Sequence, residues 1–236
     1  MKQRGQDPSN VSRETPPDEE TWLALERWLG LRLSGVQRDA LVTYGEWLAT
    51  EALQAGGIGP GERTRLYDRH VFDSLGYLRG LQSGEDRQDI PRSQGVPRDG
   101  DVVDVGAGVG LPGIPMAIAV PWLTFTLVDR SDRRTFLARR AVRILGLENV
   151  EVQTIDAGRL DQRFDTVVFR ASLPIPQAAT TFQSLATQGG TGLLGVSRRE
   201  AAPVVPSPPD GVAYDLTSEW PGVLDSPFWL LRMRRT

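Results

Sequence analysis

From residue 101 onward, short apolar stretches alternate with amphipathic helical patterns, and no other feature restricts the possible folds as strongly. Patterns typical of strands lie at 102–106, 123–129, 150–156, 164–171 and 191–197, and helical patterns lie at 114–120, 133–147 and 174–190. Strands and helices that alternate at this spacing predict βαβ units and a parallel sheet covered on both faces. Two further strand patterns, within 212–221 and 226–235, indicate a hairpin at the edge of that sheet.

The first hundred residues have a different character. Residues 1–18 are polar and include three prolines, so we expect a disordered tail there. Helical patterns follow at 19–30, 35–54 and 63–78. Ser34 is placed to cap the second of these helices. The stretch 82–100 is polar and rich in Gly and Pro, and we place a boundary there between a helical N-terminal region (19–95) and a second domain (96–236).

Composition excludes several classes of site. The chain has no cysteine and one histidine, His70, so it cannot form disulfides and has few ligands for zinc, and no metal is expected. A net charge of −3 disfavours broad contact with nucleic acid, although it allows a local basic face. No apolar run is long enough to span a bilayer and the first residues are polar, so we expect a cytoplasmic protein without membrane contact.

The stretch DVVDVGAGVGLPG, residues 101–113, places glycines directly after the first expected strand. In a doubly wound sheet this loop lies where ligands bind, because glycine lets a ligand approach the backbone and the next helix presents free N–H groups. The pattern Asp-x-Gly-x-Gly-x-Gly, typical of S-adenosylmethionine-dependent methyltransferases, is filled by Asp104, Gly106, Gly108 and Gly110. The dinucleotide pattern Gly-x-Gly-x-x-Gly also fits, from Gly108 onward.

The residues around this loop favour S-adenosylmethionine over a dinucleotide. In the dinucleotide alignment the first glycine comes two residues late, and Pro112 and Pro115 remove N–H groups that would hold a pyrophosphate. Asp129 ends the second expected strand, where a carboxylate can accept both ribose hydroxyls of either ligand. Asp156 follows the third, where it either faces the adenine amine or caps the next turn.

The segments RHVFDSL, GAGVGLPGIP and FRA resemble the family of bacterial small-subunit ribosomal RNA guanine-N7 methyltransferases, also called the glucose-inhibited division protein B family. The Leu-Pro-Gly-Ile-Pro after the glycines is the most specific part of the match, and IGPGERTRLYDRH resembles divergent forms from high-GC bacteria. The similarity extends from about Leu41 to Ser197. It implies a Rossmann-like methyltransferase domain preceded by helices, and methylation of a guanine N7 in 16S ribosomal RNA.

The resemblance also implies roles for individual residues. The family positions that contact S-adenosylmethionine correspond to Gly106, Leu111, Asp129, Ala157, Gly158 and Arg170. The basic pair assigned to the RNA or active-site face corresponds to Arg133 and Arg134. The His-x-x-Asp-Ser signature corresponds to His70, Asp73 and Ser74.

The chain departs from the family at several positions. Trp47 is followed by Leu48 where the family usually has Trp-Asn, and no Asn-Leu-Thr occurs in that helix. The family's lysine-glycine pair after the fifth strand is absent from LLGVSRRE, residues 193–200. The family's arginine and glutamate around the end of the third strand fall on Asp156 and Gly158. We therefore expect less positive charge near the site than the family has.

Methyl transfer to guanine N7 needs in-line positioning and no general base, because N7 carries an unprotonated lone pair, so no catalytic residue is predicted. Arg170, expected on the loop after the fourth strand, is placed to pair the carboxylate of the cofactor's methionine. His70 is interpreted as a packing residue between the N-terminal helices and the sheet, with Asp73 or Ser74 as a helix cap. A solvated helix face is expected for Arg139, Arg140 and Arg143.

Together these patterns predict an α/β protein with a Rossmann-like class I methyltransferase sheet and a small helical N-terminal extension. The resemblance implies S-adenosyl-L-methionine-dependent methylation of a guanine N7 in 16S ribosomal RNA, and we expect a monomer that acts on the RNA or on the small ribosomal subunit. Two alternatives stay open: a divergent methyltransferase for another RNA site or a small molecule, and a non-catalytic module that binds S-adenosylmethionine or RNA. A nicotinamide-dependent oxidoreductase fits the loop less well.

Overall fold

The computed structural model describes residues 16–82 and 96–236. The disordered tail predicted for residues 1–18 lies almost entirely outside these residues. So does most of the polar stretch at 82–100, where the sequence places a domain boundary. Among the residues described, no helix combines the length and the apolar character needed to cross a membrane.

Seven strands form one sheet in the order β3-β2-β1-β4-β5-β7-β6. They are β1 (Asp101–Val105), β2 (Thr124–Asp129), β3 (Val150–Thr154), β4 (Phe164–Arg170), β5 (Ala186–Ser197), β6 (Val212–Glu219) and β7 (Phe228–Arg235). β1 to β5 run parallel to one another, and β7 runs antiparallel between β5 and β6. This is the sheet of a Rossmann-like class I methyltransferase, so the predicted fold class is confirmed. The predicted C-terminal hairpin is also confirmed, with β6 at the edge.

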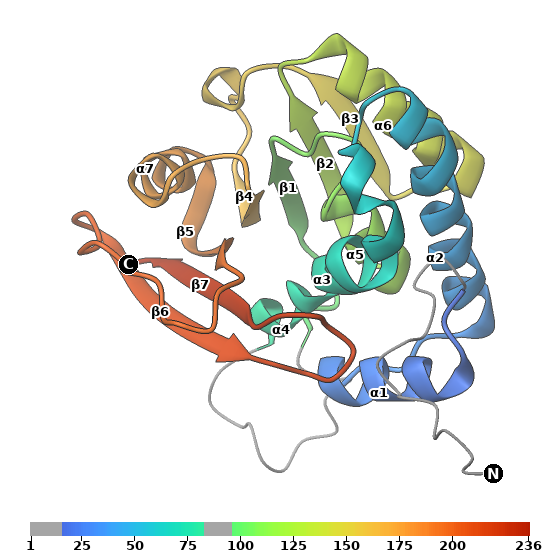
Figure 1. Cartoon of the computed structure of the whole chain (residues 1–236). Helices are drawn as coiled ribbons and strands as arrows, with labels where there is room; N and C mark the ends of the chain where they lie inside the picture. Colours follow the sequence, from blue (N-terminus) through green and yellow to red (C-terminus); the bar gives the residue numbers. More distant parts are fainter. Residues whose placement is uncertain (1–15, 83–95) are drawn as a thin grey trace, which may run out of the picture.

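Helices cover the two faces of the sheet unequally (Figure 1). They are α1 (Glu19–Leu29), α2 (Gly35–Trp47), α3 (Phe72–Gly76), α4 (Leu78–Leu81), α5 (Gly113–Ala119), α6 (Asp132–Leu145) and α7 (Ile175–Leu185), joined by the short turns η1 (Leu48–Ala52), η2 (Pro60–Arg65), η3 (Leu66–Val71) and η5 (Ala157–Arg159). Val102 packs with α1–α6 in one cluster, whereas its neighbour Val103 packs with α7 in the other. Because β1 is buried on both faces, it reads in sequence as an almost continuous apolar run.

Local signals fix most helix ends as the sequence predicts. Ser34 and Gln37 form a reciprocal capping box at the start of α2. α1 and α6 end at Gly30 and Gly146, which both adopt the left-handed conformation that glycine tolerates best. These ends depend on neighbouring residues alone, and for that reason they are readable from sequence.

Two predicted helices are wrong in detail. The helix expected over 174–190 ends at Leu185, because the chain from Ala186 pairs with β4 and starts β5 twelve residues long. The helix expected over 63–78 is broken into a 3₁₀ turn, the wide turn η3 and the short helices α3 and α4. Wide turns of this kind often occur at functional sites, since they redirect side chains.

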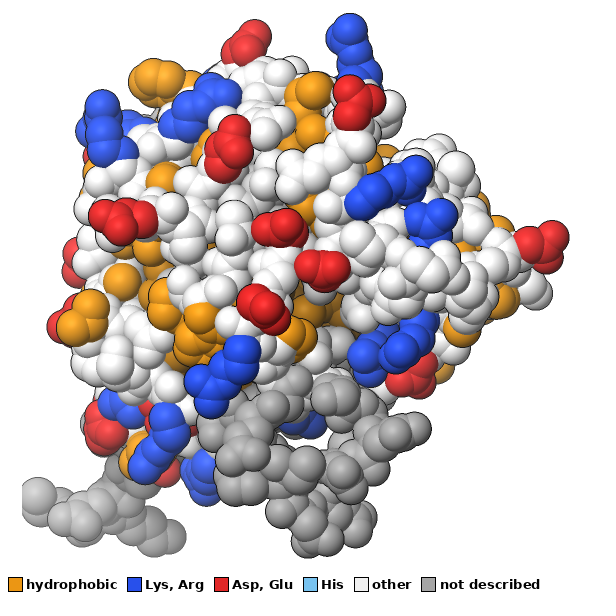
Figure 2. Space-filling model, turned by 180° about the vertical axis from the view of Figure 1, so that it is seen from behind, with side chains coloured by type: hydrophobic (Ala, Val, Ile, Leu, Met, Phe, Trp, Pro, Cys, Tyr) orange, Lys and Arg blue, Asp and Glu red, His pale blue; other side chains and the backbone are white. Residues whose placement is uncertain are grey.

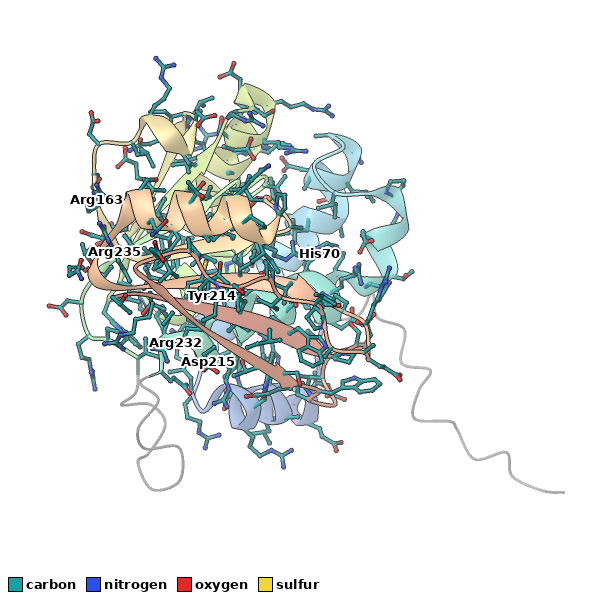
Figure 3. All side chains as sticks on the ribbon, turned by 90° about the vertical axis from the view of Figure 1, so that its left-hand side faces the viewer. His70, Arg163, Tyr214, Asp215, Arg232 and Arg235 are labelled. Atoms are coloured by element: carbon teal, nitrogen blue, oxygen red, sulfur yellow. The ribbon has the colours of Figure 1, made fainter. Side chains whose placement is uncertain are left out.

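The carboxyl ends of the parallel strands gather at one edge of the sheet. Figure 3 shows His70 at this edge, opposite Arg163 and Arg235 at the other end of the strands. Arg163 precedes β4, and Arg235 ends the antiparallel β7, so both mark the amino ends of the parallel strands. The N-terminal segment that carries His70 therefore covers the edge at which ligands bind in sheets of this type.

Candidate cofactor and substrate site

The glycine loop after β1 is held against β2 by its own backbone. Gly106 and Ala107 donate hydrogen bonds of 2.8 and 3.0 Å to the carbonyl of Val128. Gly106 has a φ of 76°, and a Cβ there would lie 2.5 Å from the Cβ of Ser172, so no other residue fits without rearrangement. Gly108 also has a positive φ, 59°, but a Cβ at this position would meet nothing within 4 Å. The loop thus packs tightly at Gly106 and leaves an open approach at Gly108.

Asp129, at the end of β2, accepts backbone hydrogen bonds on both carboxylate oxygens, and one of them comes from the glycine loop. Oδ2 accepts a hydrogen bond of 3.0 Å from the N–H of Gly108, and Oδ1 accepts one of 2.9 Å from the N–H of Ser131. Each carboxylate oxygen can accept a second hydrogen bond, so two acceptor positions remain for a pair of hydroxyl groups. These acceptor positions therefore fit the ribose role that the sequence predicts for Asp129.

Asp104 supports the loop from inside. Its side chain is 1% exposed, and Oδ2 accepts a hydrogen bond of 2.8 Å from the N–H of Gly113. Burial raises the pKa of Asp104 to about 7, although the Gly113 N–H and the charge of Arg170 oppose the rise. A group so deeply buried supports the shape of the loop from behind.

The residues predicted at the adenine end lie one strand further along the same edge. Asp156 is exposed after β3, and its Oδ1 accepts a hydrogen bond of 2.9 Å from the N–H of Gly158. Through this oxygen Asp156 caps the next turn, which is one of the two roles that the sequence predicts for it. Its Oδ2 lies 3.9 Å from a guanidinium nitrogen of the exposed Arg130. Ala157 and Gly158 begin the turn η5 beside it.

Arg170 is the last residue of β4 and not part of the following loop, which corrects the sequence prediction. Its Nε donates to Asp73 Oδ2 at 3.1 Å, and its Nη2 donates to the carbonyl of Arg69 at 2.9 Å and contacts His70 Nδ1 at 3.1 Å. Although burial opposes it, the charge of Asp73 raises the pKa of Arg170. Among the described residues, Arg170 thus pairs with the carboxylate of Asp73, whereas the sequence suggested that it pairs with the carboxylate of the cofactor.

Asp73 connects two arginines that are far apart in sequence. It is 1% exposed, and it forms ion pairs with Arg170 and with Arg198, which follows β5. The predicted capping role of Asp73 or Ser74 is wrong, because the chain enters α3 from the helical turn η3 and no side chain caps that helix. Ser74 instead donates from Oγ to the carbonyl of His70, at 2.5 Å.

His70 is a neutral packing residue between the N-terminal segment and β4, in line with its sequence interpretation. Burial and the charge of Arg170 lower the pKa of His70 to about 3. Because an arginine can only donate, the Nδ1 that faces Arg170 accepts and Nε2 carries the proton. Nε2 lies 3.2 Å from Glu62 Oε2, at an angle that forms no hydrogen bond.

A pocket of about 680 Å³ opens between these groups at the carboxyl ends of β4 and β5. This size is ordinary for a small-molecule site, which takes about 300–1,000 Å³. Its charged lining comprises Glu62, Arg69, Asp73, Arg170 and Arg198. Its aromatic lining comprises Tyr77, Phe228 and Trp229. We call this cavity the arginine pocket.

The basic pair predicted to face RNA lies in the first turn of α6. Arg133 and Arg134 are both exposed, and Arg134 reaches within 3.8 Å of Asp129 Oδ2. Cations are unfavourable at the N-terminus of a helix, so these side chains do not stabilise α6. Further along the helix, where the sequence predicts a solvated face, Arg139 donates to the carbonyl of Val152 and Arg140 pairs with Glu51.

No large basic surface is visible on the face shown in Figure 2, where acidic and basic side chains are interspersed. Positive charge instead concentrates inside the arginine pocket and at the start of α6. Sequence reasoning missed Arg198 and Ser172 as site residues. Arg198 directly follows β5 in the stretch SRRE, residues 197–200, but nothing in that stretch separates it from Arg199. Among the described residues, no group of acidic and histidine side chains could hold a metal ion.

Comparisons with known proteins agree on one family. The family model described as rRNA small subunit methyltransferase G matches residues 37–195. A ribosomal RNA small subunit methyltransferase G from Acidothermus cellulolyticus is 36% identical over 67% of this chain and 64% of its own length. One from Corynebacterium efficiens is 33% identical over 75% of this chain and 73% of its own length. The chain spans between 58% and 64% of the length of three relatives with this name, those from Acidothermus cellulolyticus, Frankia casuarinae and Nocardioides sp..

Among solved structures, a SAM-dependent methyltransferase from Aquifex aeolicus is 17% identical, with a TM-score of 0.43. The match covers 57% of this chain and 81% of that one.

Proposed function

The chain belongs to the rRNA small subunit methyltransferase G family, and from this premise we propose that it transfers a methyl group from S-adenosyl-L-methionine to a guanine N7 of 16S ribosomal RNA. The observation that carries the proposal is the glycine loop joined to Asp129. This loop offers an open backbone at Gly108, beside a carboxylate with two unused acceptor positions. A phosphate-free ligand with a ribose, such as the cationic S-adenosylmethionine, fits this donor and acceptor set better than a pyrophosphate does.

Each part of the cofactor has a proposed place along this edge. We assign the ribose hydroxyls to Asp129 and the adenine to Asp156, Ala157 and Gly158. The loop residues Gly106 to Leu111 would lie along the ligand, with Gly110 closing the turn. When bound, the cofactor supplies a methyl carbon whose bond to sulfur breaks, with the electron pair leaving on sulfur, as the N7 lone pair bonds to that carbon.

The side chains of the site fit a transfer without proton exchange. His70 is neutral, and both of its ring nitrogens face other side chains. Asp73 is held by two arginines. Neither group is therefore placed as a free base, and N7 methylation requires none. What the protein contributes is orientation and exclusion of water, and intramolecular positioning alone can account for several kcal/mol of a barrier.

The RNA side of the proposal rests on the start of α6. Arg130, Arg133 and Arg134 are exposed close to Asp129, at a helix N-terminus that itself favours anions. Their placement fits phosphate groups that flank the target nucleotide better than it fits helix stability. Each phosphate contact removed is expected to reduce the slope of log affinity against log salt by about 1.

The first test is calorimetric titration with S-adenosylmethionine. We expect micromolar binding by the wild-type chain and about 10-fold weaker binding by Asp129→Asn, which loses one charge-assisted acceptor. Asp161→Ala, an exposed acid far from the loop in sequence, is the matched control and should bind like wild type. Equal affinity in all three proteins would remove Asp129 from the site.

The second test is transfer of labelled methyl groups to small ribosomal subunits that lack the modification. Digestion of the product RNA to nucleosides should yield N7-methylguanosine. Tight cofactor binding without transfer to subunits or to naked RNA would contradict the enzyme and favour the non-catalytic module.

A further inference from the structure

The arginine pocket borders the glycine loop, and its own ligand has not yet been assigned. Ser172 lines the pocket, and its Cβ is the atom that a side chain at Gly106 would strike. One residue therefore touches both the loop proposed for the methyl donor and the cavity beside it. A group bound in the pocket would lie next to whatever the loop presents.

Among the described residues, five polar atoms of the pocket lining are buried without a hydrogen bond: Glu62 Oε2, His70 Nε2, Asp73 Oδ1, Ser172 Oγ and Arg198 Nη1. The first three lie in ion-pair contacts, which leaves Ser172 Oγ and Arg198 Nη1. Arg198 is anchored to Asp73 through Nη2, so Nη1 is the arm of its guanidinium that remains available. Arg170, by contrast, already uses Nε and Nη2 on Asp73, Arg69 and His70. Buried polar atoms are normally paired, so an unpaired donor in a cavity indicates a ligand acceptor.

The charges around the pocket favour the same kind of ligand. Three guanidinium groups face two carboxylates, and the histidine between them is neutral. The surplus positive charge suits a group with partial negative charge, such as a carbonyl oxygen. It disfavours an amino group, which would bring its own N–H towards the arginine.

The aromatic residues of the pocket indicate a flat ligand. Tyr77 and Phe228 pack edge to face at 5.6 Å, and Trp229 is fixed by a hydrogen bond of 2.8 Å from Nε1 to the carbonyl of Arg199. Gly195 leaves the space that the Tyr77 hydroxyl occupies, so that the ring can lie beneath the pocket. Nucleobases taken out of a stack are commonly held against such rings.

We propose that the arginine pocket takes the extruded target guanine, and that Arg198 reads the base by donating from Nη1 to the carbonyl oxygen O6. This inference rests on the proposed function, because it places the substrate base beside the methyl donor. O6 adjoins N7 on the base, so a donor on O6 holds N7 in place while leaving its lone pair free. Adenine carries an amino group where guanine has O6, and its N–H would oppose the N–H of Arg198. Arg198 is thus a specificity-determining residue.

The test compares Arg198→Ala with Arg199→Ala, a neighbouring exposed arginine with the same loss of charge. We expect Arg198→Ala to reduce kcat/KM for small subunits about 10- to 100-fold, as expected for loss of a charge-assisted hydrogen bond. Its Kd for S-adenosylmethionine should stay within about twofold of wild type. Arg199→Ala should match wild type in both measurements.

A second measurement uses the nucleotides GMP and AMP as probes, with S-adenosylhomocysteine present, and detects binding by saturation-transfer NMR. Wild type should prefer GMP, and Arg198→Ala should lose that preference. Should Arg198→Ala fail to fold by circular dichroism, Arg198→Lys keeps a cation for Asp73 without the second guanidinium arm, and should also lose the preference.

Three results would overturn the inference. Transfer at the wild-type rate by Arg198→Ala would show that Arg198 does not recognise the target guanine. A Kd for S-adenosylmethionine raised tenfold in that variant would show that the pocket holds the methionine end of the cofactor. Equal binding of GMP and AMP by wild type would exclude recognition of O6. If wild type binds no S-adenosylmethionine, the proposed function fails, while the nucleotide comparison still decides the ligand of the pocket.

Discussion

The carboxyl-end edge of the sheet has two halves, and their buried carboxylates have different kinds of partner. In the half built on β1, β2 and β3, the carboxylates of Asp104 and Asp129 accept hydrogen bonds from backbone N–H groups of Gly113 and Gly108. In the half built on β4 and β5, the carboxylate of Asp73 is met by side chains, those of Arg170 and Arg198. In the first half, which we call the backbone half, backbone N–H groups bind the carboxylates. In the second half, arginine side chains form a network of ion pairs with a carboxylate.

The difference lies also in the separation of the partners along the chain. Asp104 and Gly113 are 9 residues apart, and Gly108 and Asp129 are 21 apart. Asp73 and Arg170 are 97 apart. The loop can therefore form within one βαβ unit, whereas the arginine pocket requires the N-terminal segment to be docked on a finished sheet. The pocket should be the half that depends most on global stability.

The largest expected effect comes from removing the centre of the ion-pair network. Asp73→Ala leaves two buried guanidinium groups without a counter-charge, and we expect a loss of about 3–5 kcal/mol in the free energy of unfolding by urea. The exposed Asp161→Ala should change the same quantity by less than about 0.5 kcal/mol. A small loss of stability in Asp73→Ala would mean that Arg170 and Arg198 do not depend on Asp73 as their counter-charge.

The next effect tests the backbone half with two glycines that share a positive φ. Gly106→Ala adds a Cβ against Ser172, and we expect it to destabilise the protein by about 3 kcal/mol. Gly108→Ala has open space, so only the left-handed backbone opposes it, at about 1–2 kcal/mol. Both should weaken S-adenosylmethionine binding in calorimetry. Equal stability losses for the two variants would contradict the close approach at Gly106.

A smaller effect concerns the dependence of stability on pH. Because the pKa of Asp104 is raised to about 7 in the folded state, that state binds a proton that the unfolded chain has lost between pH 4 and 7. Stability from this group is full at low pH, falls as pH rises towards 7, and is constant above about 8. We expect the advantage of Asp104→Asn over wild type to grow by about 3 kcal/mol from pH 4.5 to 7.5. Parallel pH profiles of the two proteins would contradict this.

The smallest effect is expected at the exposed end of the backbone half. Asp156→Ala removes the acceptor for the Gly158 N–H, and we expect a loss of about 0.5–1 kcal/mol in the free energy of unfolding. If Asp156 also faces the adenine amine, the Kd of Asp156→Ala for S-adenosylmethionine should rise several-fold, which corresponds to the loss of about one hydrogen bond. An unchanged Kd would leave Asp156 a cap alone.

This contrast also explains what the sequence could reveal. The strands, the capping box at Ser34 and the glycine loop follow from residues close together in the chain, and each was predictable. The loop's orientation against β2 was predictable as well, because a βαβ unit has only one common geometry.

The arginine pocket could not be read in the same way. The sequence favoured a capping role for Asp73 or Ser74, since short polar side chains often cap the start of a new helix. Only the packed structure shows that the preceding turn is already helical and that Asp73 faces the sheet. Likewise, nothing local distinguishes Arg198 from Arg199, and their different exposure follows from the neighbours of β5.

The contact between α1 and β7 has a consequence for how the protein is made. Trp28 of α1 packs edge to face on Phe228 of β7 at 5.7 Å, and Phe228 and Trp229 also line the arginine pocket. Figure 1 shows α1 beside the connection between β6 and β7. During synthesis the first helices leave the ribosome long before β7 does, so the face of Trp28 that packs on Phe228 stays uncovered until the last strand follows. A nascent chain would therefore acquire its pocket only after the last strand is released.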